Sequence, residues 1–121
     1  YGDGLNIRDW IYVEDHINAL LLTIIRGKIG ESYCIGSDQE KTNLEIVNYI
    51  CNYLDEIQPK KISYKELINF VEDRPGHDKR YSINASKINK NLGWQPTYGF
   101  SESLEFTIKW YLSNKNWLLK T

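Results

Sequence analysis

The residues best suited to chemistry gather in one polar stretch, Asp73-Arg74-Pro75-Gly76-His77, which places a guanidinium, a ring-constrained turn and an imidazole close together. A turn held by proline and glycine can aim the arginine with little entropy to lose. Arginine is also the side chain best shaped to bind phosphate oxygens through two parallel hydrogen bonds. This loop therefore indicates an anion site, with phosphate as the first candidate ligand.

Arg8 is a second candidate for such a site, because it interrupts a segment (residues 5–12) that is otherwise rich in Ile, Trp and Tyr. A charge within a strand of that composition needs a partner. The charge pattern leaves two interpretations open. Either Arg8 pairs with Asp9, and Arg74 with Asp73, as structural ion pairs, or the two arginines bind an anionic ligand.

The histidines give weaker signals. Histidine can exchange a proton near neutral pH, so His77 is a possible acid or base. A single histidine in a turn is more often a hydrogen-bonding residue, however. His16 stands beside Glu14 and Asp15, and consecutive helical residues point in different directions, so these three predict no ligand cluster.

Two familiar patterns occur without the context that would make them functional. Tyr111-x-x-x-Lys115 has the spacing of a dehydrogenase acid/base pair, but the eight glycines never form G-x-G-x-x-G, so we expect no catalysis there. Cys34 and Cys51 lie in apolar runs and lack partners at metal-ligand spacing. They predict two small buried hydrophobic residues rather than a disulfide or a metal site.

Periodicity and capping predict the elements in the first third of the chain. Residues 5–12 alternate as a strand does. Apolar residues at helical spacing then predict a helix that starts near Glu14 and closes at Gly27. Residues 31–35 resemble a short strand.

Thr42-x-x-Glu45 forms a capping box ahead of a second amphipathic helix that should run to about residue 56. The remaining expectations are strands at residues 68–71 and 81–83, a polar loop at 73–80, a helix at 85–91 capped by Asn84 and stopped by Gly93, and a final helix at 100–113 that buries Leu104, Ile108, Tyr111 and Leu112. This order predicts an α/β fold in a single unit.

Length and composition limit the class of protein. A chain of 121 residues has the typical length of a single domain. A net charge of -1 argues against a broad nucleic-acid surface. The longest apolar run, residues 19–25, is far too short to span a membrane, and no signal peptide precedes it. We therefore expect a cytoplasmic protein with neither a membrane nor a nucleic acid as partner.

Two features predict that the chain is part of a longer protein. It contains no methionine, and it opens on Tyr1-Gly2-Asp3-Gly4, which is turn chemistry that normally connects two elements.

Several segments resemble one enzyme family. The stretch YGDGLNIRDWIYVEDHINAL is similar to the part of extended short-chain dehydrogenases that leads out of the nucleotide-binding half, in the form typical of dTDP-glucose 4,6-dehydratases. DRPGHDKRY, LGWQP and WYLSNKNW continue the resemblance in the right order over essentially the whole chain. The DRPGHDKRY loop is the segment most specific to the dehydratases, since nucleotide-sugar epimerases share the LGW-P pattern.

The resemblance implies a two-part enzyme, in which an N-terminal Rossmann part binds NAD and a C-terminal part holds the nucleotide-sugar. Residues 1–121 would be the C-terminal substrate-binding domain, without the Rossmann core. The full-length protein would be a homodimeric lyase of dTDP-rhamnose biosynthesis that converts dTDP-glucose to dTDP-4-keto-6-deoxyglucose and water. The family's catalytic residues lie upstream of this segment, so the resemblance assigns none here and implies that the chain alone is inactive.

The resemblance also implies a set of substrate-binding residues. Tyr1 matches a position at the nucleoside, and Arg8 and Arg74 match two arginines at the diphosphate, which favours the ligand-binding interpretation over structural ion pairs. The set is completed by Asn43 as a nucleotide contact, by Asp73, Pro75, Gly76 and His77 in the loop, with His77 as a donor to the nucleotide or sugar, and by Arg80 as a weaker candidate.

Two alternatives stay open. The chain can belong to another nucleotide-sugar enzyme, such as an epimerase or a decarboxylase, or it can be a stand-alone nucleotide-binding module without chemistry. A part of an enzyme should expose apolar surface on its first helix and on the strand containing Trp10, where the Rossmann part would pack.

Overall fold

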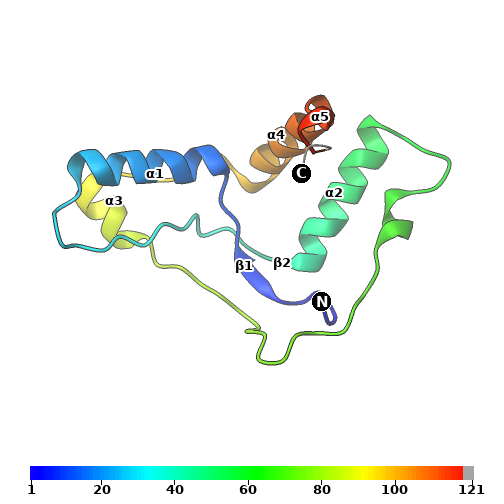
Figure 1. Ribbon diagram of the computed structural model, residues 1–121, viewed down its shortest axis with the longest axis horizontal. Coiled ribbons are helices and arrows are strands. Elements are labelled where there is room, and N and C mark those ends of the chain that lie inside the picture. Colours follow the sequence, from blue (N-terminus) through cyan, green and yellow to red (C-terminus); the bar gives the residue numbers. More distant parts are fainter. Residues whose placement is uncertain (119–121) are drawn as a thin grey trace.

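The computed structural model describes residues 1–118, in which helices flank a small two-stranded sheet (Figure 1). The elements are, in order, β1 (Ile7–Asp9), α1 (Val13–Arg26), β2 (Glu40–Thr42), α2 (Asn43–Ile57), a 3-10 helix (Tyr64–Leu67), α3 (Ser86–Leu92), α4 (Phe100–Ser113) and α5 (Lys115–Leu118). The predicted α/β class is confirmed, with helices as the larger part.

Strand β1 lies between two neighbours. It pairs antiparallel with β2, with Ile7 opposite Thr42. On its other edge the Ile7 N–H donates to the Lys79 carbonyl (2.8 Å), and the Ile7 carbonyl accepts from the Tyr81 N–H (3.1 Å). The strand expected at residues 81–83 is not formed, since the only bridge to β1 on this side, within residues 1–118, lies one residue earlier at Arg80. Both edges of β1 are occupied, which fixes the orientation of its side chains.

Helix α1 forms as predicted, and its inner face builds the main core. Ala19 is fully buried against α3 and the segment that follows it. The cluster consists of Ala19, Ile88, Leu92 and Trp94, with Ile11, Leu22, Tyr33, Ile35 and Ala85 packed around it.

Asp15 is the charged side chain buried in this part of the molecule. It is 1% exposed, although it lies in the first turn of α1. Its carboxylate accepts hydrogen bonds from the backbone N–H groups of Thr97 (3.0 Å) and Tyr98 (3.2 Å). Asp15 therefore fixes the chain that leads into α4 against α1.

Helix α2 starts with the predicted capping box. The Thr42 hydroxyl accepts from the Glu45 N–H (3.1 Å), while the Glu45 carboxylate accepts from the Thr42 N–H (2.7 Å). Both groups satisfy backbone donors that the first helical turn would leave unpaired.

Replacing Thr42 with alanine should lower the free energy of unfolding by about 1 kcal/mol, because one end of this box is lost. Glu45→Gln keeps an acceptor for the Thr42 N–H and should lower the free energy of unfolding by a smaller amount. Chemical denaturation of both variants measures the difference, and equal losses would contradict this assignment.

Two further predicted strands are wrong. Residues 31–35 and 68–71 form no regular element, since neither segment finds a strand partner within residues 1–118. Cys34 is consequently exposed, against expectation, whereas Cys51 on α2 is buried as predicted. The pairing partner of β1 is instead β2, whose Glu-Lys-Thr sequence shows no apolar alternation.

The later helices match their predicted positions. α3 stops before Gly93, which is in the left-handed conformation, and α4 has the expected bounds. The N-cap position of α3 is Ala85 and not the predicted Asn84, whose side chain accepts from the Ser86 N–H (2.9 Å). Ile108 is buried and Leu104 and Leu112 are half-buried, but Tyr111 is exposed, which corrects one expected core position. The short helix α5 was not predicted, and it follows α4 without a proline or glycine to mark the boundary.

Asp9, adjacent to Arg8, organises the turn ahead of β2. Its carboxylate accepts from the backbone N–H groups of Ser37 (2.9 Å), Asp38 (3.3 Å) and Gln39 (3.1 Å), and from the Ser37 hydroxyl (2.7 Å). The backbone passes so near that a Cβ on Gly36 would lie 2.6 Å from Asp9 Oδ2. Asp9 is therefore a structural residue that holds residues 36–39 against β1.

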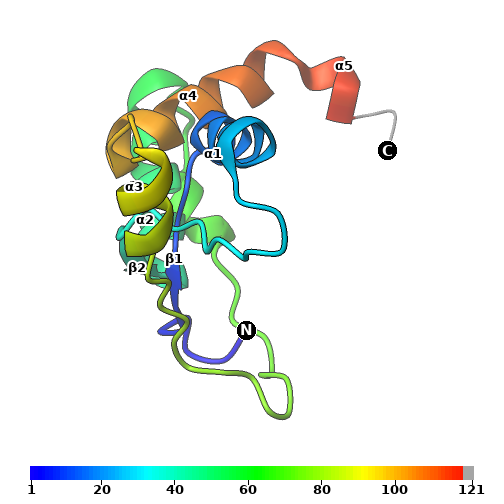
Figure 2. The same cartoon turned by 90° about the vertical axis from the view of Figure 1, so that its left-hand side faces the viewer.

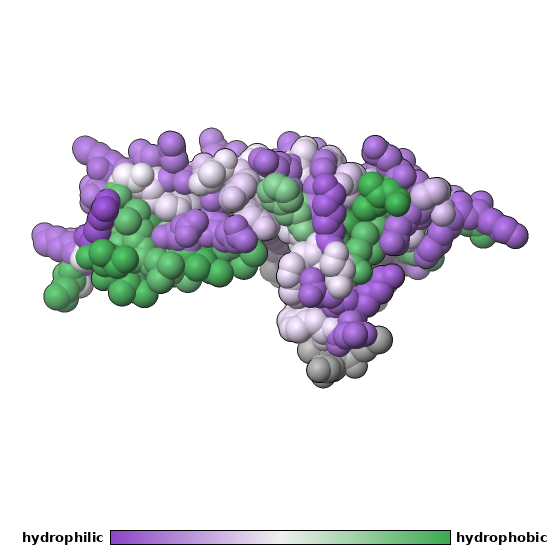
Figure 3. All heavy atoms as spheres, turned by 90° about the horizontal axis from the view of Figure 1, so that it is seen from above, coloured by the Kyte–Doolittle hydropathy of each residue, from purple (hydrophilic) through white to green (hydrophobic). Residues whose placement is uncertain are grey.

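The outer face of α1 is apolar and exposed. Ile24 is 80% and Ile25 75% exposed, and Val13, Ile17, Leu20 and Leu21 extend the surface along the helix. Figure 3 shows hydrophobic atoms gathered along one side of the arm that α1 forms. The accessible surface of 8922 Å² exceeds the roughly 6,800 Å² typical of a compact monomer of this mass. The expected apolar patch is present on α1, whereas Trp10, the other expected source of exposed apolar surface, is half-buried.

Within residues 1–118, no helix combines the length and the hydrophobicity that crossing a bilayer requires.

An apolar patch of this kind promotes self-association. We expect the chain to sediment as concentration-dependent oligomers, and a variant carrying Ile24→Lys and Ile25→Lys to shift towards monomer. Ile62→Lys is the matched control, because Ile62 is 68% exposed in the loop after α2, away from this face. A monodisperse wild-type monomer in sedimentation velocity would contradict the prediction.

Candidate functional site

The predicted loop is built on a tight turn at the edge of the molecule, next to the N-terminus (Figures 1 and 2). The His77 N–H donates to the Arg74 carbonyl (3.1 Å), with Pro75 and Gly76 between them. Gly76 has φ of 72°, the left-handed value that a type II turn requires at its third position. Proline and glycine thus preset the backbone that carries Arg74 and His77.

The N-terminal segment packs against this loop. The Gly2 N–H donates to the Val71 carbonyl (2.8 Å). The Arg74 guanidinium lies 5.2 Å from the centre of the Tyr1 ring, and the Tyr1 and His77 rings meet edge-on at 6.4 Å. Tyr1 is therefore brought next to Arg74 and His77, two other residues predicted for the site that lie far from it in sequence.

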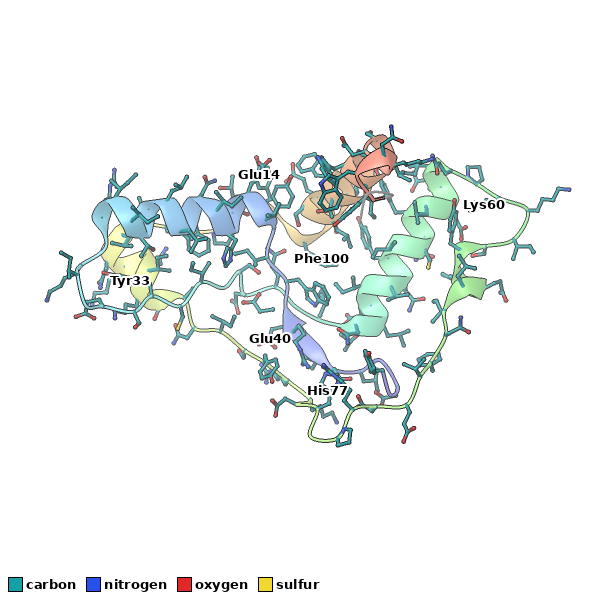
Figure 4. All side chains as sticks on the ribbon, in the orientation of Figure 1. Glu14, Tyr33, Glu40, Lys60, His77 and Phe100 are labelled. Atoms are coloured by element: carbon teal, nitrogen blue, oxygen red, sulfur yellow. The ribbon has the colours of Figure 1, made fainter. Side chains whose placement is uncertain are left out.

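Arg8 reaches the same loop from β1 and is held on several sides. Its guanidinium donates to the carbonyls of Ile7 (2.6 Å) and Asp78 (3.0 Å). Its Nη2 lies 2.9 Å from His77 Nε2, and its Cζ stacks 4.4 Å from the centre of the Tyr81 ring. Figure 4 shows His77 beside β1 at the loop. These contacts orient the planar group before any ligand arrives.

Within residues 1–118, neither Arg8 nor Arg74 forms an ion pair with a carboxylate. Asp9 is occupied by the turn at residues 36–39, and Asp73 accepts from the Arg74 N–H (2.9 Å) and faces His77 Nδ1 (2.7 Å). The interpretation of the two arginines as structural ion pairs therefore finds no support.

Two further predicted site residues, Asn43 and Arg80, differ in how available they are to a ligand. Asn43 is the first residue of α2, and its N–H donates to the carbonyl of Asn6, which places the start of that helix beside β1. Arg80 donates through Nε and Nη2 to the two carboxylate oxygens of Glu40 (both 3.0 Å). Because Glu40 engages it, Arg80 is less available to a ligand than Arg8.

Three residues of this cluster were not predicted. Asn6 is buried and donates to the Asp78 carbonyl (3.3 Å), and the Tyr81 hydroxyl donates to the Asp78 carboxylate. This hydrogen bond raises the pKa of Tyr81. Asn6 had a signal in the sequence, because Asn6 and Arg8 are two positions apart in a strand and share a face. Asp78 and Tyr81 lie in the DRPGHDKRY segment that carries the resemblance, but their residue types did not indicate these contacts.

The chemistry of the cluster is that of binding. It offers two guanidinium groups and an aromatic ring, and no group of three or more metal-ligating side chains occurs within residues 1–118. The described residues also lack a glycine-rich turn between a strand and a helix, which a dinucleotide pyrophosphate needs. The described residues therefore offer groups that suit an anion such as a diphosphate.

Carboxylates in and around the site accept hydrogen bonds that hold their pKa values below the usual range. The His77 side chain lowers the pKa of Asp73, the Arg80 side chain that of Glu40, and the Thr42 backbone that of Glu45. A carboxyl whose pKa is lower in the folded state stabilises the fold above its unfolded pKa and loses that contribution as the pH falls through the folded value.

We therefore expect the free energy of unfolding to be constant near neutral pH and to fall as the pH drops below about 4. Denaturant titrations across this range measure the slope. Glu40→Gln removes one of the contributing groups and should flatten it, and an unchanged slope would contradict the role of the Arg80–Glu40 pair.

The fold corresponds to the C-terminal part of enzymes of the extended short-chain dehydrogenase type. The chain belongs to the GDP-mannose 4,6 dehydratase family, whose model matches residues 1–107. Among curated relatives, the dTDP-glucose 4,6-dehydratase of Escherichia coli is 52% identical over 118 residues, and that of Haemophilus influenzae is 52% identical over 120. The matches cover 98% and 96% of this chain, which spans about one third of the length of these relatives.

Solved structures agree with the sequence relatives. The dTDP-glucose 4,6-dehydratase of Bacillus anthracis, in complex with NAD, superposes with a TM-score of 0.84 at 43% identity, over 97% of this chain and 35% of that one. The UDP-glucuronic acid 4-epimerase of Bacillus cereus gives 0.76 at 28% identity, over 93% of this chain and 34% of that one. Both dehydratases and epimerases thus share this fold.

Proposed function

We propose that residues 1–121 form the nucleotide-sugar-binding domain of a dTDP-glucose 4,6-dehydratase. The observation that carries this proposal is the convergence of Arg8, Arg74 and Tyr1 on one loop, with neither arginine paired to a carboxylate within residues 1–118. Two oriented guanidinium groups suit the two phosphates of a nucleoside diphosphate.

Each group of candidate residues contacts a different part of the ligand. Arg8 and Arg74 bind the diphosphate, Tyr1 packs on the nucleoside, and Asn43 contributes a contact at the N-terminal end of α2, where the helix dipole favours an anion. Asp73, Pro75, Gly76 and His77 shape the loop. This domain binds and orients the substrate and holds no group in contact with the reacting atoms.

In this proposal NAD, which accepts and returns the hydride in such an enzyme, is bound by a second part of the protein. The whole protein is a cytoplasmic homodimeric lyase that releases dTDP-4-keto-6-deoxyglucose and water, and the present chain alone is inactive. The exposed face of α1 supports this division, since a surface of that size and polarity is normally covered in a folded enzyme.

A chimera tests the proposal. In the chimera, this chain replaces the corresponding third of the Escherichia coli relative. The assay measures formation of product from dTDP-glucose. We expect an active dehydratase, whereas the chain alone should give no product. A chimera that folds and binds NAD but neither binds dTDP nor turns over would overturn the proposal.

Competition between nucleotides separates the dehydratase from an epimerase of the same fold. In the chimera we expect dTDP to displace bound substrate more effectively than UDP. Preference for UDP would favour the epimerase alternative, to which the structural likeness at 28% identity also points.

A further inference from the structure

His77 is enclosed, and both of its ring nitrogens are already engaged in the ligand-free chain. Its side chain is 8% exposed. Nδ1 lies 2.7 Å from Asp73 Oδ1, and Nε2 lies 2.9 Å from Arg8 Nη2. A ring in this position must break one of these contacts before it can donate to a ligand.

The two partners determine where the imidazole proton lies. An ionised carboxylate can only accept and a guanidinium can only donate, so the Asp73 contact requires a proton on Nδ1 and the Arg8 contact requires a lone pair on Nε2. The arrangement therefore defines one neutral tautomer. The Asn6 amide nitrogen, 3.4 Å from Nδ1, cannot donate to a protonated Nδ1, because both nitrogens are then donors; it donates to the Asp78 carbonyl.

We propose that His77 acts as a positioning residue, a neutral imidazole that Asp73 orients and that in turn accepts a hydrogen bond from Arg8 and aims its guanidinium at the ligand. The proposal rests on the proposed function for the identity of the ligand, and it changes the expected role of His77 from a direct donor to a support.

The other contacts of Arg8 show why such a support matters. The Tyr81 ring restrains the plane of the guanidinium from one face, and the carbonyls of Ile7 and Asp78 hold part of its edge. The contact with His77 engages the second proton of Nη2, whose first proton is donated to the Asp78 carbonyl, and so holds this end of the guanidinium. Without it the same charge is present, but the N–H groups that remain free for the ligand are oriented less firmly.

The first test needs no ligand. Ring ¹⁵N shifts of His77 in the isolated chain, assigned against a His77→Asn variant, should show the Nδ1-protonated tautomer, with His16 as the internal comparison. A proton on Nε2, or a doubly protonated ring at neutral pH, would overturn the proposal whether or not the chain binds a nucleotide.

The second test is a double-mutant cycle with dTDP as the probe in calorimetric titrations. His77→Asn keeps a donor for Asp73 but cannot reach Arg8, and should weaken binding by about tenfold. His77→Gln places an amide oxygen near the Nε2 position and should recover most of this loss. In an Arg8→Ala background, His77→Asn should change the affinity by less than about twofold.

Additive losses for the two residues would show that His77 contacts the ligand by itself, and would overturn the positioning role. Backbone amide spectra of each variant exclude unfolding as the cause. Failure of the wild-type chain to bind dTDP, together with the predicted tautomer, would count against the proposed function and not against the Asp73–His77–Arg8 arrangement.

Discussion

Replacing Arg8 with alanine should weaken dTDP binding by about 30-fold, the largest loss that we expect from a single side chain at this site. Arg8 is already oriented by Asp78, His77 and Tyr81 in the free chain, so its side chain loses little conformational entropy when the ligand binds. Arg8→Lys keeps the charge but not the planar fork, and should still lose about tenfold. Titration calorimetry with dTDP measures both.

The matched control is Arg26→Ala, which removes an exposed arginine at the far end of α1 and should leave the affinity unchanged. Inorganic pyrophosphate should show the same loss with Arg8→Ala, because the missing contact is to the diphosphate. A variant that loses dTDP but keeps pyrophosphate would place Arg8 at the nucleoside and contradict our assignment.

The largest loss of stability should come from replacing Asp15. Replacing it with alanine leaves the N–H groups of Thr97 and Tyr98 without their acceptor in a buried position, and should cost about 3 kcal/mol of unfolding free energy. Asp15→Asn should cost a similar amount, because its amide turns one acceptor into a donor facing a donor.

Glu14→Ala is the control for this prediction. Glu14 is an exposed acidic residue in the same turn of α1, so its loss should remove about 0.5 kcal/mol of helix-dipole stabilisation and no more. Denaturant unfolding of the variants side by side decides the matter, and an Asp15→Ala protein as stable as Glu14→Ala would show that the buried hydrogen bonds contribute little.

The elements that the sequence predicts well carry their signal locally. The Thr42–Glu45 box, the helical spacing of α1 and the Gly93 stop each lie within a few residues, and each appears as expected. The strand expected at residues 31–35 failed because a strand depends on a partner, and composition does not reveal whether one is in reach. The role of Asp15 was hidden for the same reason, since its donors are more than 80 residues away.

The candidate site was predictable in its residue types and less so in its contacts. The Pro75-Gly76 turn and the unusual charge of Arg8 pointed to an anion, and the structure places both at one loop. Only the structure shows that Arg8 contacts His77 and not Asp9. Adjacent strand residues face opposite sides, and the sequence alone does not say which side holds the ligand.

The alternation of Arg8 and Asp9 on β1 makes the length of the preceding segment as important as its composition. Adding one residue between Leu5 and Arg8 would rotate the strand by one position, so that a carboxylate would face the phosphates and a guanidinium would face the donor-rich turn at residues 36–39. Adding two would restore both faces. Insertions of one residue here should therefore be more damaging than insertions of two, because only an even number keeps Arg8 on the side of the ligand.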